Sequence, residues 1–181
     1  MTLLTVAQFR EHVTTSLGDD AIQRLLDDAE AAIVAFAGPV GSITELVDGG
    51  GTRISLSRPI DAAGDVSAIS ERADSSSPLT LAANDWALRG RYVLERLRTG
   101  TNGGIYWRLP VSVTYTPVDD TATRKMIQVE LIKIEIAFNP ALASETVGAW
   151  TQTYSSTNRT YPEWRADALG RLREPGMVVI N

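Results

Sequence analysis

The chain has 181 residues, of which 44% are hydrophobic, and its formal net charge is −5. This length suits one compact domain, or one domain with a satellite, and the apolar fraction suffices for a core. There is no cysteine and a single histidine, His12, which excludes disulfides, thiolate zinc sites, histidine-based triads and multi-histidine metal sites. A carboxylate-only magnesium or calcium site stays open, although no EF-hand spacing is present. We expect no cofactor.

The charge is distributed unevenly along the chain. Residues 1–48 contain two arginines and eight acidic residues, whereas residues 49–118 contain eight arginines and six acidic residues. Residues 119–181 are close to neutral, with seven basic and eight acidic residues. Proteins that bind nucleic acid usually present a net basic face, so this balance argues against general nucleic-acid affinity.

The N-terminal residues show no sign of a targeting segment. The sequence MTLLTVAQFREHV lacks the apolar run of a signal peptide. No stretch of the chain approaches the ~20 apolar residues of a membrane span. We therefore expect a soluble protein made in the cytosol.

Two helices are predicted at the N-terminus. The first lies within residues 4–13 and begins at Thr5, with three apolar residues, Val6, Phe9 and Val13, on one face. The second lies within residues 19–39, where Asp19 or Asp20 is expected to cap it. Its apolar residues recur at three- and four-residue spacing: Ile22, Leu25, Leu26, Ala29, Ile33 and Phe36.

The second helix is expected to end at Gly38 and Pro39, and its other side is acidic. Asp27, Asp28 and Glu30 lie on that side. A solvated polar face explains these residues better than an acidic catalytic cluster, because no histidine or lysine lies nearby in the sequence.

From residue 43 the sequence changes to short segments separated by turn-forming residues. The stretch ITELVDGGGTRISLSRP predicts two strands around a glycine-rich turn, with Ile54 and Leu56 alternating, and VSAISERA predicts another strand. The glycines are not followed by the Gly-Lys-Ser/Thr of a phosphate loop. IYWRLPVSVTYTPV alternates over Val111, Val113 and Tyr115 and predicts a further strand.

Residues 85–98, DWALRGRYVLERLR, favour a hairpin that turns at Arg89–Gly90. A glycine inside a helix costs ~1 kcal/mol relative to alanine, but the alternation of apolar residues is imperfect, so a helix stays open. In a hairpin the arginines would lie on the faces or the edge of a sheet, where they discourage stray strand pairing. These arginines are Arg89, Arg91, Arg96 and Arg98.

A third helix, TATRKMIQVELIKIEIAFNP, is expected after a cap at Asp119 or Asp120 and ends at Asn139–Pro140. It carries two apolar stripes, one of Ile127, Leu131, Ile134 and Phe138 and the other of Val129, Ile132 and Ile136. Such a helix is buried on more than one side, which favours a core on one side and a neighbouring subunit on the other. A strand-forming run of isoleucine and valine is the alternative.

The last forty residues fit a compact domain poorly. VGAWTQTYSS is strand-like, and YPEWRADALGRLR predicts a helix that begins after Pro162. The chain is then expected to leave the helix at Pro175–Gly176 and to end in an extended apolar tail. An unpaired apolar strand is best explained if another chain accepts it.

The order of these segments resembles the head-to-tail connector, or adaptor, proteins of long-tailed bacteriophages, and the resemblance covers nearly the whole chain. DDAIQRLLDDAEAAIVAFAGP resembles the family's helical start, DWALRGRYVLERL its strand, glycine turn and strand, and MIQVELIKIEIAFNP its long helix. VGAWTQTYS resembles the strand-like segment that follows this long helix in the family, and LREPGMVVI resembles the family's C-terminal end, which contains arginine and proline. The implied fold is α+β, with a helical core of three to four helices, an inserted small antiparallel β-domain and an extended C-terminal tail.

The resemblance also implies boundaries. Residues 1–40 would form the N-terminal helical part of the core, and residues 41–118 the inserted β-domain. Residues 119–145 would be the long helix that completes the core. Residues 146–181 would contain the strand-like segment, the C-terminal helix and the docking tail.

The function implied is that of a structural virion protein without enzymatic activity. About twelve copies would form a ring below the portal, extend the DNA channel and provide a platform for tail or stopper attachment. The implied partners are the portal protein, a stopper or tail-completion protein on the tail side, and further copies of the chain. Packaged DNA would pass through without sequence-specific binding, and no membrane is involved. The implied location is the head–tail junction of the virion, and the host cytoplasm during assembly.

Three groups of residues receive roles from this resemblance. The tail that docks on the portal would consist of Arg171, Leu172, Arg173, Pro175, Met177, Val178, Val179 and Ile180. Candidates for subunit contacts are Arg89, Arg91, Arg96, Trp150 and Tyr154. Asp27 and Asp28 are candidates to face the channel, where a repulsive wall keeps DNA from sticking; an outer solvated face is the alternative.

Two other interpretations remain. A stopper or tail-completion protein of the same junction also forms a ring. More remotely, the two N-terminal helices form a helix-turn-helix that binds DNA, although Asp27, Asp28 and Glu30 occupy positions where a recognition helix needs basic or amide side chains. Only Gln23 and Arg24 favour that interpretation.

Overall fold

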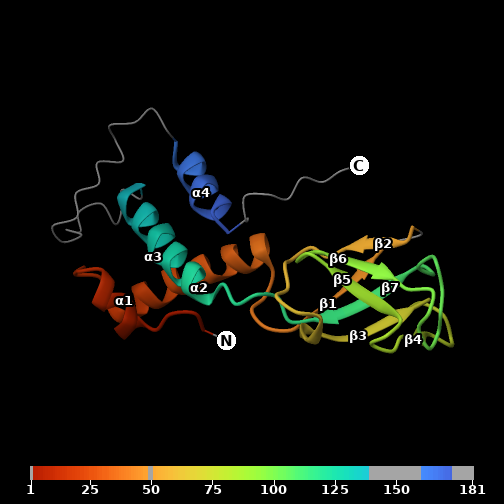
Figure 1. The fold of residues 1–181 in the computed structure, drawn as a ribbon. Helices are drawn as coiled ribbons and strands as arrows, with labels where there is room; N and C mark the ends of the chain where they lie inside the picture. The colour runs from red at the N-terminus through yellow and green to blue at the C-terminus, as the bar shows by residue number, and fades with distance from the viewer. Residues whose placement is uncertain (1, 49–50, 139–159, 173–181) are drawn as a thin grey trace. The chain divides into compact units, whose positions relative to one another are not determined.

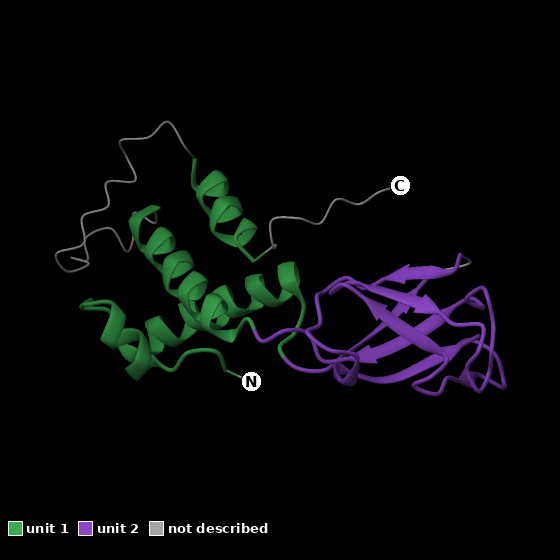
Figure 2. Ribbon diagram, viewed as in Figure 1, with its two compact units in different colours: residues 1–40, 120–181 green, residues 41–119 purple. Residues whose placement is uncertain are grey.

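The structure is a computed structural model, and it describes residues 2–48, 51–138 and 160–172. These residues form four α-helices and two antiparallel sheets (Figure 1), so the predicted α+β class is confirmed. The chain divides into two compact units (Figure 2): a helical unit of residues 1–40 and 120–181, and a β unit of residues 41–119. The β unit is therefore inserted in the sequence between two halves of the helical unit.

The first helix, α1 (Val6–His12), begins at Thr5 as predicted. The Thr5 hydroxyl accepts a hydrogen bond from the Gln8 N–H at 3.3 Å, and the Gln8 side chain accepts one from the Thr5 N–H at 3.1 Å. This capping box satisfies two backbone donors at the start of the helix. Phe9 is fully buried, which gives the helix its anchor in the core.

The second helix, α2 (Asp19–Ala37), ends at Gly38 as predicted, where a φ of 75° suits glycine. The predicted aspartate cap is wrong, because Gly18 is the capping residue and makes no side-chain hydrogen bond. Asp19 and Asp20 lie instead in the first turn, where their charge interacts favourably with the positive end of the helix dipole.

The third helix, α3 (Thr121–Phe138), is a helix and not the alternative strand. Both predicted apolar stripes are buried, apart from the half-buried Phe138. The buried Arg124 joins α3 to the end of α2, since its guanidinium donates to the carbonyl oxygens of Gly38 at 2.7 Å and Ala37 at 3.2 Å. Arg124 thereby satisfies carbonyls that have no partner within α2.

The fourth helix, α4 (Tyr161–Gly170), has Pro162 in its first turn, which is a favoured position for proline. It ends at Gly170, earlier than predicted, and the predicted exit at Pro175–Gly176 lies outside the described residues. Ala168 is buried against the other helices. The core of the helical unit is made of apolar side chains from all four helices and includes Phe9, Ile22, Leu26, Ile33, Ile127, Leu131, Ile134 and Ala168.

The β unit contains two antiparallel sheets, with strand orders β1-β7-β3-β4 and β2-β6-β5. Their strands are β1 (Ile43–Val47), β2 (Arg53–Ser55), β3 (Val66–Glu71), β4 (Leu79–Thr80), β5 (Trp86–Arg89), β6 (Val93–Arg96) and β7 (Val111–Tyr115). The predicted strands on either side of the glycine-rich turn exist, but they belong to different sheets, because β1 pairs with β7 and β2 pairs with β6. Residues of both sheets and of the segments between the strands enclose a separate core that includes Ile54, Leu56, Ile69, Leu94, Trp107, Val111, Val113 and Tyr115.

The predicted hairpin at residues 85–98 is confirmed. Strands β5 and β6 pair antiparallel, with Trp86 opposite Arg96 and Arg89 opposite Val93. Gly90 has a φ of 68° in the turn, a conformation that favours glycine.

Among the described residues, no helix has both the length and the apolar character to span a membrane.

Candidate functional site

Arg96 is buried inside the β unit, and its side chain is only 2% exposed. Its Nε donates to Glu71 Oε1 at 2.9 Å, and its two other nitrogens donate to the carbonyl oxygens of Asp85 at 2.8 Å and Asn102 at 2.7 Å. The guanidinium carbon also lies 5.9 Å from the centre of the Trp107 ring. The expectation that Arg96 lies on a sheet face or edge is wrong, because these partners hold it in the interior, and it is no longer a candidate for a subunit contact.

Arg89 and Arg91 lie at the surface of the β unit, as predicted. Arg89 pairs with Glu95 at 2.5 Å, and Arg53 pairs with the same carboxylate at 3.1 Å. The hydrogen bonds from these two arginines hold the pKa of Glu95 below its ordinary value. Arg91 pairs with Asp61 at 3.1 Å. Both arginines remain candidates for contacts with other molecules, since exposed pairs of this kind exchange partners at small cost.

Asp85 fixes the loop that follows β6. Its carboxylate is fully buried and accepts hydrogen bonds from the Asn102 N–H at 2.6 Å, the Asn102 side chain at 2.8 Å and the Ala82 N–H at 2.8 Å. Burial alone would raise the pKa of Asp85, but these hydrogen bonds and the charge of Arg96 outweigh it, so the pKa is lowered. The buried charges of the β unit therefore hold its own loops in place.

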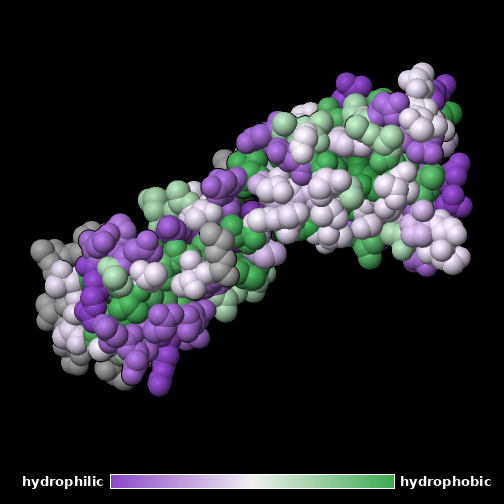
Figure 3. Space-filling view, turned by 90° about the horizontal axis from the view of Figure 1, so that it is seen from below, coloured by the Kyte–Doolittle hydropathy of each residue, from purple (hydrophilic) through white to green (hydrophobic). Residues whose placement is uncertain are grey.

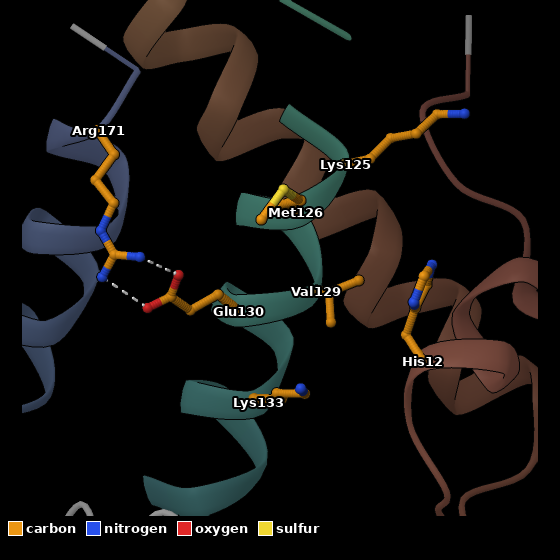
Figure 4. A pocket seen from close by; sticks show the side chains of 7 residues that line it. All are labelled: His12, Lys125, Met126, Val129, Glu130, Lys133 and Arg171. Carbon is orange, nitrogen blue, oxygen red and sulfur yellow. Dashed lines mark hydrogen bonds and ion pairs between the residues drawn. The ribbon is translucent and has the colours of Figure 1, made fainter. Parts of the chain in front are cut away.

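The helical unit contains an open pocket of about 480 Å³, which we call the basic groove. Side chains from α1, α3 and the end of α4 line it (Figure 4): His12, Lys125, Met126, Val129, Glu130, Lys133 and Arg171. Three cationic side chains and one carboxylate surround it, and both lysines of the chain are among them. Met126 is 74% exposed within the groove.

Arg171 holds one side of the basic groove (Figure 4). Its guanidinium makes two hydrogen bonds to the Glu130 carboxylate, at 2.8 and 3.0 Å, and one to Asp167 at 3.4 Å. Partial burial would lower the pKa of Arg171, but the charges and hydrogen bonds of Glu130 and Asp167 outweigh it, so the pKa is raised. Arg171 thus remains a fixed positive charge. Positive charge around an exposed methionine suits the binding of an acidic surface with small apolar side chains.

A second feature of the helical unit is an acidic row along α2, which we call the acidic face. Its exposed residues follow helical spacing: Asp20, Arg24, Asp27, Asp28, Ala31, Val34 and Ala35. Asp27 accepts a hydrogen bond from Gln23 at 2.8 Å, and Val34 is 38% exposed. The two predicted channel candidates, Asp27 and Asp28, are therefore at the surface. Figure 3 shows one face of the helical unit, where apolar residues lie between strongly hydrophilic ones.

Asp28 also lies beside a smaller pocket of about 290 Å³ between α2, α3 and α4. There the Tyr161 hydroxyl is hydrogen-bonded to the Glu135 carboxylate and accepts a hydrogen bond from Arg165 at 2.6 Å. Burial, together with the neighbouring carboxylate, raises the pKa of Tyr161. This cluster joins α4 to α3, and the polar groups of Tyr161, Glu135 and Arg165 are hydrogen-bonded to one another.

Most of the predicted docking tail, and two of the predicted subunit contacts, lie outside the described residues. These are Trp150, Tyr154, Arg173, Pro175, Met177, Val178, Val179 and Ile180. Arg171 and Leu172 are described, and they do not extend away as a tail: Arg171 lines the basic groove, and Leu172 packs against the helical core. Their contact with the portal stays a prediction.

Sequence reasoning missed the basic groove. Its lining residues come from both ends of the chain, from His12 to Arg171, so no local pattern marks it. One feature of the sequence could have indicated this groove: the only two lysines, Lys125 and Lys133, lie on one predicted helix, on either side of the apolar Val129. In the described part of the chain no cluster of three or more histidine, cysteine or acidic residues is placed to hold a metal ion.

A scan against protein-family models gives no match to this chain, and a search of curated proteins gives no significant match either.

Proposed function

We propose that the protein is a structural virion component, a head-to-tail adaptor that forms a ring below the portal and offers a platform for the next tail-side protein. In this role it has no enzymatic activity and needs no cofactor. Its partners are the portal protein, further copies of the chain, and a stopper or tail-completion protein.

One observation carries this proposal: a helical unit interrupted between α2 and α3 by a complete β unit with its own core. This is the organisation that the resemblance to adaptor proteins implies. The insertion leaves α2 and α3 packed together and joined through Arg124, so the helical unit is continuous in space although it is divided in the sequence.

The surfaces of the helical unit also suit an assembly protein. Methionine is enriched at binding surfaces, and a basic groove and an acidic helix face give each surface a charge that a partner can complement. Neither surface offers a nucleophile beside a general base. The acidic face also disfavours the helix-turn-helix alternative, because Asp27 and Asp28 are exposed on α2 and would repel phosphate groups.

The proposal is tested by co-expression of the full chain with the portal protein of the same virus, followed by purification on a tag placed on the portal and measurement of particle mass. We expect a complex whose mass exceeds that of the portal by several copies of this chain, with no retention of the free chain on DNA at moderate salt. A chain that does not bind the portal and is retained on DNA at moderate salt would support the DNA-binding alternative. A chain that binds only once another ring covers the portal would be a stopper or tail-completion protein.

A further inference from the structure

We propose that the basic groove of one copy receives the acidic face of α2 from a second copy, and that this contact joins neighbouring subunits. The inference rests on the proposed function, because it names the surfaces through which the ring would close. It concerns only the helical unit, in which both surfaces lie.

Charge complementarity identifies the occupant. The groove presents Lys125 and Lys133 beside Arg171, whose guanidinium is paired within the chain with Glu130 and Asp167. The acidic face presents three aspartates and one arginine in a row. The whole chain carries a net charge of −5, so two copies repel one another, and a basic surface that meets an acidic surface offsets this repulsion at short range.

The apolar parts of the two surfaces are complementary as well. Met126 is 74% exposed in the groove, and its flexible side chain can adapt to a partner. On α2 the acidic residues are followed along the same face by Ala31, Val34 and Ala35, which are small and exposed. Contact between them would remove Met126 and Val34 from water, while the charges on either side fix the register.

The geometry of such a contact leads to a ring. The two surfaces are different, so each copy can bind one neighbour through its groove and another through its acidic face. A head-to-tail contact of this kind gives a closed ring or an open filament, whereas a contact between identical surfaces stops at a dimer. Closure of the ring adds avidity to each contact.

Disulfide crosslinking tests the contact directly, because the natural chain has no cysteine. We expect the full-length double variant Ala31→Cys/Met126→Cys, oxidised at high protein concentration and low salt, to give a ladder of linked oligomers. Either single variant alone should give no ladder, and a mixture of the two should give a linked dimer. The matched control Ser76→Cys/Met126→Cys replaces the α2 position with an exposed position of the β unit. A double variant that crosslinks no further than this control would overturn the inference.

Charge reversal provides the second test. Lys125→Glu/Lys133→Glu and, separately, Asp27→Lys/Asp28→Lys should each weaken self-association by about tenfold or more, measured by sedimentation velocity at low salt. A mixture of the two variants should recover association, because each then offers the surface that the other lacks. Asp74→Lys, an exposed change in the β unit, is the matched control. Loss without recovery in the mixture would contradict the pairing, provided that circular dichroism shows both variants to be folded.

The two proposals fail in different ways. Suppose that electron microscopy shows a ring on the portal, but the Ala31→Cys/Met126→Cys variant forms no crosslinks between neighbouring copies. That result would reject the pairing and leave the adaptor function intact. A crosslinked ladder from a chain that does not bind the portal would reject the adaptor function and leave the pairing intact.

Discussion

Two ion pairs, one from each unit of the molecule, use charged residues in opposite ways. In the β unit, Arg96 and Glu71 form an ion pair whose side chains are 2% and 0% exposed, and their role is internal. In the helical unit, Arg171 and Glu130 form a pair whose side chains are 54% and 25% exposed, at the edge of an open groove. Buried pairs are costly to break, whereas exposed pairs contribute little to stability and can serve binding. The comparison separates arginines that maintain the fold from those available to partners.

The largest expected effect is the loss of Arg96. The Arg96→Ala variant leaves the Glu71 carboxylate buried without its partner, so we expect the free energy of unfolding of the β unit to fall by about 3–5 kcal/mol. Hydrogen exchange of the β-strand amides in the full chain measures this for the β unit alone. Arg91→Ala, in the same hairpin but paired at the surface with Asp61, should cost less than about 1 kcal/mol. Equal losses in the two variants would remove the distinction between buried and exposed pairs.

A smaller loss is expected from Gly100→Ala, which tests the loop held by Asp85. A Cβ at Gly100 would lie 2.2 Å from Asp85 Oδ1 and 2.5 Å from the Asn84 carbonyl oxygen, and the backbone cannot easily yield. We expect a loss of about 1–3 kcal/mol in urea unfolding. Gly64→Ala is the control, because a Cβ there meets nothing within 4 Å. Unchanged stability in Gly100→Ala would show that the loop is not packed against Asp85.

Acid should weaken the β unit through the same aspartate. The folded-state pKa of Asp85 lies below its ordinary value of 3.8, so the stabilisation is present above that value and is lost as the pH falls through the folded-state pKa. Unfolding free energies measured at a series of pH values should therefore decline below pH 3.8 more steeply in the natural chain than in Asp85→Asn. Parallel pH profiles of the two proteins would contradict this assignment.

The smallest effect on stability is expected in the helical unit. Arg171→Ala removes an exposed pair, so we expect the free energy of unfolding to change by less than about 1 kcal/mol. Thermal unfolding followed by circular dichroism measures this change. Self-association of the same variant should weaken, because the basic groove loses one of its cationic side chains. A variant that is strongly destabilised would place Arg171 among the residues that hold the fold.

Local patterns predicted most of the secondary structure. The spacing of Ile22, Leu26 and Ile33 identified α2, and Gly38 marked its end. Gly90 indicated the turn between β5 and β6. These features are local, because a few neighbouring residues determine helix periodicity and turn conformation.

The rest depends on contacts between residues far apart in the sequence. Nothing near Arg96 in the chain shows that it is buried, because its carboxylate partner, Glu71, is on another strand in the other sheet. Arginine is almost never fully buried unless it is paired, so the local expectation was a surface position. The basic groove was missed for the same reason, since it forms only when α1, α3 and the end of α4 pack together.

Cryo-electron microscopy of intact particles, or of the chain bound to the portal, tests the adaptor function most directly. We predict density for a ring of this chain below the portal, with the helical units of neighbouring copies joined through the basic groove and the acidic face. A chain that is absent from the particle and is retained on DNA at moderate salt would contradict the proposed function.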